Sequence, residues 1–200
     1  MPNFDPRHLH LMPYDAAAPL IENASLLQYR GNAVFSRLIQ LGTLGVHSHS
    51  AMVRRNGCNR IDVLEMVEHA GGRAQPLDGH VERRPGKIDV FRPRREKWPE
   101  FDPDGAVSYM RDLTSRRYGT WGILRLATMR CFGARLYWLL RGFPYDDAAG
   151  YDANPFCSQA VSTAYRLGGG VDPVPRKPDF LTTPNDLTWS LFFEYQFTLV

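Results

Sequence analysis

The 200-residue sequence has few cysteines, little net charge and no long apolar run that is free of charged residues. Its three cysteines, Cys58, Cys131 and Cys157, show no spacing typical of a zinc site or a disulfide framework, which favours a reducing compartment. The net charge of +3 is too small to indicate a nucleic-acid partner. The first twenty residues lack the basic start and apolar centre of a signal peptide. We therefore predict a cytoplasmic protein that does not bind nucleic acid.

The longest apolar stretch, Trp121 to Leu140, contains three arginines and is therefore a poor membrane span. We expect it to form one or two helices packed beside a groove of the domain, with the arginines in solvent or paired with acidic side chains. Contact of the protein with a membrane or lipid stays open as an alternative, but it is not favoured.

The rest of the composition is ordinary for a globular protein, with 44% hydrophobic and 22% charged residues. This length suits one domain with its own core, so we predict a single domain over 1–200. Within it we expect an irregular N-terminal arm at 1–24 and a helical insertion or cap at 105–141. Hydrophobic periodicity predicts strands at 25–29, 49–55, 61–67 and 87–93, helices at 32–42, 105–115, 121–141 and from Cys157 onward, and a strand or helix at 186–200.

Cys157 opens the stretch "CSQAVSTAYRLGG", in which apolar residues recur at helical spacing before closing glycines. Pro155 stops any preceding helix, so Cys157 lies in the first turn. Unpaired N–H groups and the positive end of the helix dipole stabilise a thiolate there, and a lowered thiol pKa is what a nucleophile needs at neutral pH. The alternative is a small, buried and unreactive cysteine.

A nucleophilic thiol needs a base, and His49 is the best-placed candidate among six histidines. It begins a predicted strand and shares a face with Ala51 and Val53. Two alternatives stay open. A histidine on an apolar face is often an ordinary core residue, and His47 together with His49 would form half of a metal site. Because no third and fourth ligand stands at convincing spacing, we expect no metal.

Glu65 is the candidate that would orient the histidine. It shares a strand face with Ile61, Val63 and Val67, where a carboxylate is costly unless a partner satisfies it. The neighbouring strand offers His49 as that partner. If Glu65 instead faces solvent at a sheet edge, it has no part in the site.

The turn between the two strands decides whether His49 and Glu65 share a face. Asn56-Gly57 favours a two-residue turn, which would place His49 opposite Leu64 and turn Glu65 to the other face. A shared face therefore requires an odd-numbered loop or a bulge. We predict such a loop or bulge despite the Asn-Gly signal.

Three stretches in this order carry a resemblance to a known family: "FSRLIQLGTLGVHSHSAMV", "VLEMVEHAGG" and "FCSQAVSTAYRLGG". They resemble the circularly permuted, NlpC-like branch of the papain-like cysteine hydrolases, which includes the YiiX-like proteins. In the usual order the cysteine helix precedes the histidine strand, whereas in this branch the histidine comes first, as it does here. The resemblance spans roughly residues 25–180.

The resemblance implies an α+β, papain-like fold in which a small antiparallel sheet packs against the cysteine-bearing helix. It implies Cys157 as the nucleophile, His49 as the base and Glu65 as the polar third member of a triad. By the same resemblance, a tyrosine of the substrate site is Tyr118 or Tyr145, with Tyr118 preferred. Ser158, which follows the cysteine, is the other expected substrate contact.

Together these residues predict a thiol hydrolase that cleaves amide bonds in a small peptide or acyl-amide through a thioester, with no metal or organic cofactor. An acyltransferase or lipid esterase with the same triad is one alternative. It is favoured if Trp121, 136–140 and Phe192-Phe193 form an exposed apolar rim. A non-enzymatic binding module is the other alternative, and in that case Cys157 and His49 do not meet.

Overall fold

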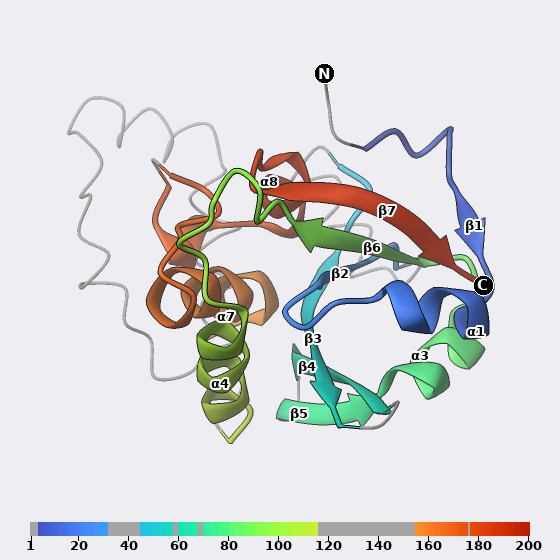
Figure 1. The fold of residues 1–200 in the computed structure, drawn as a ribbon, viewed down its shortest axis with the longest axis horizontal. Coiled ribbons are helices and arrows are strands. Elements are labelled where there is room, and N and C mark those ends of the chain that lie inside the picture. The colour runs from blue at the N-terminus through green and yellow to red at the C-terminus, as the bar shows by residue number, and fades with distance from the viewer. Residues whose placement is uncertain (1–3, 32–44, 58–59, 68–69, 116–154, 176) are drawn as a thin grey trace.

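A seven-stranded mixed sheet forms the centre of the fold (Figure 1). The computed structural model describes residues 4–31, 45–57, 60–67, 70–115, 155–175 and 177–200. The strands are β1 (Leu11–Met12), β2 (Leu26–Tyr29), β3 (His49–Asn56), β4 (Arg60–Val67), β5 (Gly71–Pro76), β6 (Ile88–Pro93) and β7 (Phe193–Leu199). They lie in the order β1-β7-β6-β2-β3-β4-β5, antiparallel throughout except for the parallel pair of β1 and β7.

This architecture confirms the predicted α+β class and corrects the size of the sheet. We expected a small antiparallel sheet, but strands from both ends of the described chain extend it. β7 pairs with β6, and β1 then adds to β7, so the sheet becomes larger and mixed. Pairings between segments this far apart in sequence leave no local signal.

Helices lie on both faces of the sheet (Figure 1). α4 (Pro103–Leu113) and α7 (Cys157–Thr163) cover one face, and α1 (Tyr14–Ala17) and α3 (Leu77–Arg83) cover the other. α7 continues into a π-helical turn, Ala164–Gly168, and α8 (Pro184–Trp189) precedes β7. Short 3-10 turns follow α1, at Ala18–Leu20, and precede α8, at Asp179–Leu181.

The central strands are buried on both faces. Met52 and Leu64 belong to the apolar core beneath α4 and α7, whereas Ala51 and Val63 belong to the core beneath α1 and α3. All four side chains are fully buried. Because successive strand residues point to opposite faces, burial on both sides explains why apolar residues such as Val63 and Leu64 stand next to each other in β4.

The register of β3 against β4 confirms the predicted odd-numbered loop. Asn56 pairs with Arg60, so three residues separate the paired ends of the strands. Glu65 pairs with Ala51, which lies two residues after His49. Because side chains alternate along a strand, this register turns Glu65 and His49 to the same face.

The strands predicted at 25–29, 49–55, 61–67 and 87–93 are confirmed, each within one residue at either end. The helix predicted at 105–115 is α4, which begins earlier because Asp102 caps it. The Asp102 carboxylate accepts hydrogen bonds from the backbone N–H groups of Asp104 and Gly105, and Pro103 takes the first helical position. The terminal segment 186–200, predicted as a strand or a helix, contains most of α8 and then β7.

Two structured segments were not predicted. Residues 1–24, expected to be an irregular arm, contain β1 and α1, and the backbone N–H of Thr198 donates to the carbonyl of His10. Residues 71–83 contain β5 and α3, although Gly71-Gly72 and Pro76 disfavour a strand. β5 forms because β4 offers it a free edge for pairing.

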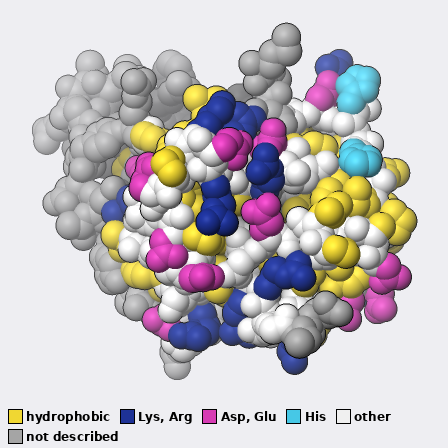
Figure 2. All heavy atoms as spheres, viewed as in Figure 1, with side chains coloured by type: hydrophobic (Ala, Val, Ile, Leu, Met, Phe, Trp, Pro, Cys, Tyr) yellow, Lys and Arg dark blue, Asp and Glu magenta, His cyan; other side chains and the backbone are white. Residues whose placement is uncertain are grey.

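Phe192 and Phe193 do not form the exposed apolar rim that would favour a lipid esterase or acyltransferase, because they are only 2% and 0% exposed. Both pack edge-on against the ring of Tyr165 in the core beneath α4 and α7. On the face drawn in Figure 2, basic and acidic side chains are interspersed. Among the helices of the described ranges, none has the length and apolar character needed to cross a membrane.

Several other predictions fall outside the described residues. They are the helices at 32–42 and 121–141, the remainder of the cap at 105–141 after α4, the two tyrosines Tyr118 and Tyr145, and the cysteines Cys58 and Cys131. Those predictions stay as they were made.

Candidate active site

Cys157 is the first residue of α7. The preceding residue, Phe156, has extended backbone angles and marks the start of the helix. Backbone N–H groups of Ser50 and Ser158 donate to the Cys157 sulfur. The thiol is buried, with 5% of the residue exposed.

His49 lies between the thiol and Glu65. It is the first residue of β3, and the two elements that carry His49 and Cys157 therefore meet where each begins. His49 Nε2 lies 2.7 Å from Glu65 Oε2, and the same ring hydrogen-bonds the Cys157 thiol. Since Nε2 is taken by the carboxylate, Nδ1 is the nitrogen left for the thiol.

Glu65 is buried, with its side chain 1% exposed, and both of its oxygens are engaged. Oε2 takes the bond from His49, while Oε1 lies 2.7 Å from both Nε and Nη2 of Arg73. His80 Nε2 lies 3.7 Å from the same Oε1 atom. The carboxylate is thus paired with His49 of β3 and Arg73 of β5, which offsets the cost of its burial.

Tyr29 packs between the two histidines on this face. Its ring centroid lies 5.2 Å from that of His49 and 5.9 Å from that of His80, both edge-on. Its hydroxyl lies 3.1 Å from His80 Nδ1. The guanidinium of Arg84 lies 5.6 Å above the Tyr29 ring. These contacts restrict the rings of both histidines.

The electrostatics favour an ion pair between Cys157 and His49. Burial opposes a charged imidazole, but the Cys157 thiolate and the Glu65 carboxylate outweigh it and raise the pKa of His49 to about 10. Burial likewise opposes a thiolate, but the His49 imidazolium and the N–H groups of Ser50 and Ser158 hold the pKa of Cys157 below its ordinary value. A lowered thiol pKa beside a raised imidazole pKa is the pattern of a thiolate–imidazolium pair.

The pKa values of Glu65 and of its neighbour His80 are both lowered. Burial would raise the pKa of Glu65, but His49, His80 and Arg73 lower it to about 2. Burial and nearby arginines lower the pKa of His80 to about 4, against the pull of Glu65. At neutral pH the site therefore holds an ionised Glu65 and a neutral His80.

The lowered pKa of Glu65 predicts a specific loss of stability in acid. A carboxyl whose folded pKa lies below its unfolded value stabilises the protein above the unfolded pKa and loses that contribution as the pH falls. The shift from 4.5 to about 2 corresponds to about 2 kcal/mol lost between pH 6 and pH 3. Urea unfolding of the wild type and of Glu65→Gln at both pH values measures it: the gap in unfolding free energy between them should shrink by that amount. An unchanged gap contradicts the assignment.

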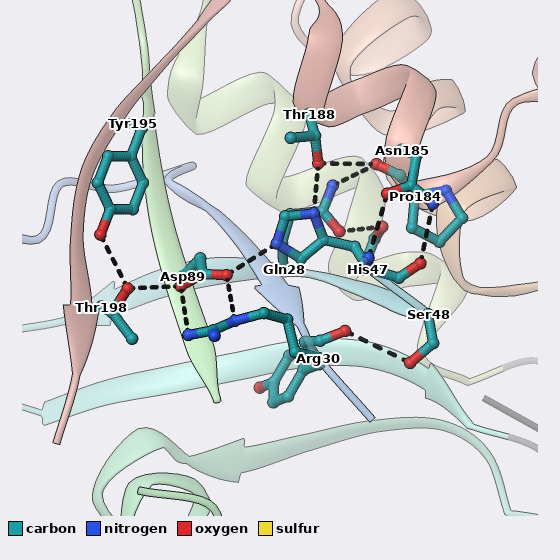
Figure 3. A network of polar contacts seen from close by, with 12 residues as sticks. Gln28, Arg30, His47, Ser48, Asp89, Pro184, Asn185, Thr188, Tyr195 and Thr198 are labelled. Carbon is teal, nitrogen blue, oxygen red and sulfur yellow. Dashed lines mark hydrogen bonds and ion pairs between the residues drawn. The ribbon is translucent and has the colours of Figure 1, made fainter. Parts of the chain in front are cut away.

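His47, two residues before the start of β3, hydrogen-bonds a different set of side chains from His49 (Figure 3). Its Nε2 lies 2.8 Å from Asp89 Oδ2, and its Nδ1 lies 2.9 Å from Thr188 Oγ1. His47 and His49 are therefore bonded to different carboxylates. Within the described ranges no group of three or more His, Cys, Asp or Glu residues is arranged to hold a metal ion.

Residues 182–185, before β7, hydrogen-bond the residues at the start of α7 and those just before β3. The buried Ser158 hydroxyl donates to the carbonyl of Thr182 at 2.7 Å, so Ser158 offers the site its backbone N–H rather than its side chain. The Asn185 side chain accepts from the N–H of His47 and donates to its carbonyl (Figure 3). Gln28 bonds both the carbonyl of Pro184 and the hydroxyl of Ser50. These bonds fix the start of β3 relative to the start of α7.

Sequence reasoning missed three residues of this cluster. Tyr29 lay in a predicted strand, but its position opposite His49 depends on the pairing of β2 with β3. Arg73 and His80 lay in a segment that had no strand or helix signal. The only available hint was that a buried Glu65 needs more than one cationic or hydrogen-bonding partner.

Comparison with known proteins shows the fold. No family profile and no curated protein sequence matches the chain. Among solved structures, the metalloprotein YiiX from Escherichia coli O157:H7, a DUF1105 protein, is similar at a TM-score of 0.53 and 15% sequence identity. The likeness covers 89% of this chain and 97% of that one. This chain therefore shares the fold of YiiX.

Proposed function

We propose that this protein is a thiol hydrolase that cleaves amide bonds, in peptides or acyl-amides, with Cys157 as nucleophile, His49 as base and Glu65 as the group that orients it. We further propose that its α+β fold is a circularly permuted, NlpC-like form of the papain-like fold. One observation carries the proposal. The His49 ring bonds the Cys157 thiol and, 2.7 Å from its other nitrogen, the buried Glu65 carboxylate. A thiol, an imidazole and an orienting carboxylate in series form the arrangement that activates a thiol nucleophile.

The proposed reaction has two halves. The Cys157 thiolate attacks the amide carbon, and N–H groups at the start of α7 stabilise the oxyanion. The imidazolium of His49 gives its proton to the leaving amine as the C–N bond breaks, which leaves a thioester. His49 then takes a proton from water, the hydroxide attacks the thioester, and the carboxylic acid leaves as the thiolate re-forms. Glu65 holds the imidazole in one orientation throughout.

No step of this scheme is assigned to a metal. YiiX is described as a metalloprotein. In the described part of this chain, however, His47 bonds Asp89, His49 bonds Cys157 and Glu65, and no set of three or more His, Cys, Asp or Glu side chains is arranged as metal ligands. That donor arrangement does not fit a resident metal ion.

The alternatives gain less support from the described residues. A lipid esterase or acyltransferase would be favoured by an exposed apolar rim, but Phe192 and Phe193 are buried, and the other rim candidates, Trp121 and 136–140, lie outside the described residues. A binding module without catalysis predicts that Cys157 and His49 stay apart, whereas the ring and the thiol are hydrogen-bonded.

Alkylation tests the proposal without knowledge of the substrate. Iodoacetamide should modify Cys157 well before Cys58 and Cys131, because a thiolate reacts and a thiol does not. His49→Ala should slow modification of Cys157, since the imidazolium that stabilises the thiolate is gone. Peptide mass spectrometry over time measures all three cysteines in one sample.

Two controls accompany this measurement. His10→Ala removes an exposed histidine and should leave the Cys157 rate unchanged. Urea-unfolded protein gives the intrinsic reactivity of each cysteine. Equal modification of the three cysteines in the folded protein, indifferent to His49→Ala, would falsify the thiol-nucleophile assignment.

A further inference from the structure

Arg73 is the cation that faces the buried carboxylate of the site from the edge strand. The register of β4 and β5 places Arg73 directly opposite Glu65. Its Nε and Nη2 atoms both lie 2.7 Å from Oε1, which leaves Oε2 for His49. The carboxylate is thereby divided between two partners, and its plane is fixed by both.

We infer that Arg73 is a positioning residue that holds Glu65 against His49 and, as a permanent positive charge, sets the pH range in which Cys157 is a thiolate. This inference rests on the proposed function, because it concerns the same site. It adds a fourth member to the series Cys157, His49 and Glu65, on a strand that sequence patterns did not predict.

The charge balance of the site carries the argument. In the reactive form, the thiolate of Cys157, the imidazolium of His49 and the carboxylate of Glu65 sum to one negative charge in a buried place. An uncompensated negative charge raises the pKa of every acid near it, including a thiol. The positive charge of Arg73 brings the sum to zero.

Among the described residues, the other groups that face Glu65 do not replace Arg73 at neutral pH. His80 on α3 lies 3.7 Å from Oε1. Its pKa is lowered to about 4 by burial and by the arginines around it, so it is neutral. Tyr29 on β2 is also uncharged, because burial and Glu65 raise its pKa well above the ordinary value. Arg83 and Arg84 are exposed residues at the end of α3, where solvent screens them.

The sign of the effect follows from the position of the charge. A positive charge favours the deprotonated form of any nearby acid, so Arg73 lowers the pKa of the Cys157 thiol and of the His49 imidazolium alike. Removing Arg73 should therefore shift both limbs of the pH dependence of Cys157 alkylation, that of the thiol and that of the imidazolium, toward alkaline pH. If the lower limb, which reflects ionisation of the thiol, moves by about one pH unit, alkylation at pH values below that limb becomes roughly tenfold slower.

The experiment measures the rate of Cys157 alkylation by iodoacetamide against pH in the full-length protein. Arg73→Gln should displace both limbs toward alkaline pH, and Arg73→Lys, which keeps the charge, should stay close to wild type. Arg92→Gln is the matched control, because Arg92 is also 34% exposed and also places Nε and Nη2 on one carboxylate oxygen, that of Glu194. It should leave the profile unchanged.

A second pair of variants guards against a folding defect in Arg73→Gln. Glu65→Gln removes the negative charge and should move both limbs toward acidic pH. The double variant Glu65→Gln/Arg73→Gln buries no unpaired charge, and relative to Glu65→Gln its limbs should move back toward alkaline pH.

The outcomes separate this inference from the proposed function. If Cys157 reacts selectively but neither Arg73→Gln nor the double variant displaces the profile, Arg73 has no such role and the thiol hydrolase stands. If wild-type Cys157 shows no selective reaction, both ideas fail together. If Arg73→Lys shifts the profile as far as Arg73→Gln does, the charge is not the property that matters, and the inference is overturned.

Discussion

Replacement of Cys157 by serine is expected to abolish the proposed amide hydrolysis, with a loss of at least about a thousandfold in kcat/KM. A serine hydroxyl is far more weakly acidic than a thiol, so the ion pair with His49 cannot form and no nucleophile is present at neutral pH. The backbone N–H groups of Ser50 and Ser158 would still meet an acceptor atom of similar size. The fold should therefore survive, with a melting temperature within a few degrees of the wild type.

Turnover is measured as chromophore release from a panel of peptide and N-acyl amino acid anilides. Calorimetry on the same samples measures the melting temperature. Cys58→Ser and Cys131→Ser serve as controls of equal chemistry and should keep full turnover. Turnover retained by Cys157→Ser would show that another group carries the reaction. A large drop in melting temperature would instead mean that Cys157 has a structural role.

Removal of the Asp89 carboxylate should have the largest effect on stability in the described part of the protein. Asp89 is fully buried on β6 and joins three partners (Figure 3). Its oxygens accept from Arg30 Nε at 2.8 Å and Thr198 Oγ1 at 2.6 Å, and one lies 2.8 Å from His47 Nε2. Asp89→Ala leaves Arg30, only 15% exposed, without its counter-charge. Breaking a buried pair from one side costs about 3–5 kcal/mol.

Urea unfolding followed by circular dichroism measures this loss. Asp89→Asn keeps the shape and one acceptor oxygen, so it should fall between Asp89→Ala and the wild type. Glu194→Ala is the control, because it breaks the Arg92 pair at the surface, where Glu194 is 39% exposed, and it should cost less than about 1 kcal/mol. A cost below that value for Asp89→Ala would mean that the cluster does not hold β2, β6, β7 and the start of β3 together.

The loss at Asp89 should also reach the candidate active site. His47 lies two residues before His49. Its ring bonds Asp89, and the Asn185 side chain hydrogen-bonds its backbone. A displaced His47 would therefore move the start of β3 against α7. The same alkylation assay on Asp89→Asn, at a temperature where the variant is folded, should report a slower Cys157.

The sequence by itself determined the three residues that meet in the candidate site. Cys157 was readable because a helix start has a local signature, with Pro155 before it and helical periodicity after it. His49 and Glu65 were readable because a polar side chain on an apolar strand face needs a partner, and the neighbouring strand supplies it. The requirement that they share a face even predicted the odd-numbered loop against the Asn-Gly signal.

Tertiary structure alone decided what surrounds those residues. Arg73 reaches Glu65 only because β5 pairs with β4 in one register, and His80 joins them only because α3 then packs on that face. The buried position of Phe193 and the extension of the sheet by β1 and β7 depend on contacts between distant segments. Local periodicity records which residues prefer burial, but the free energy of pairing two remote segments belongs to neither segment alone. The three residues proposed as nucleophile, base and orienting carboxylate could thus be predicted from the sequence as neighbours, while the charge balance among them required the fold.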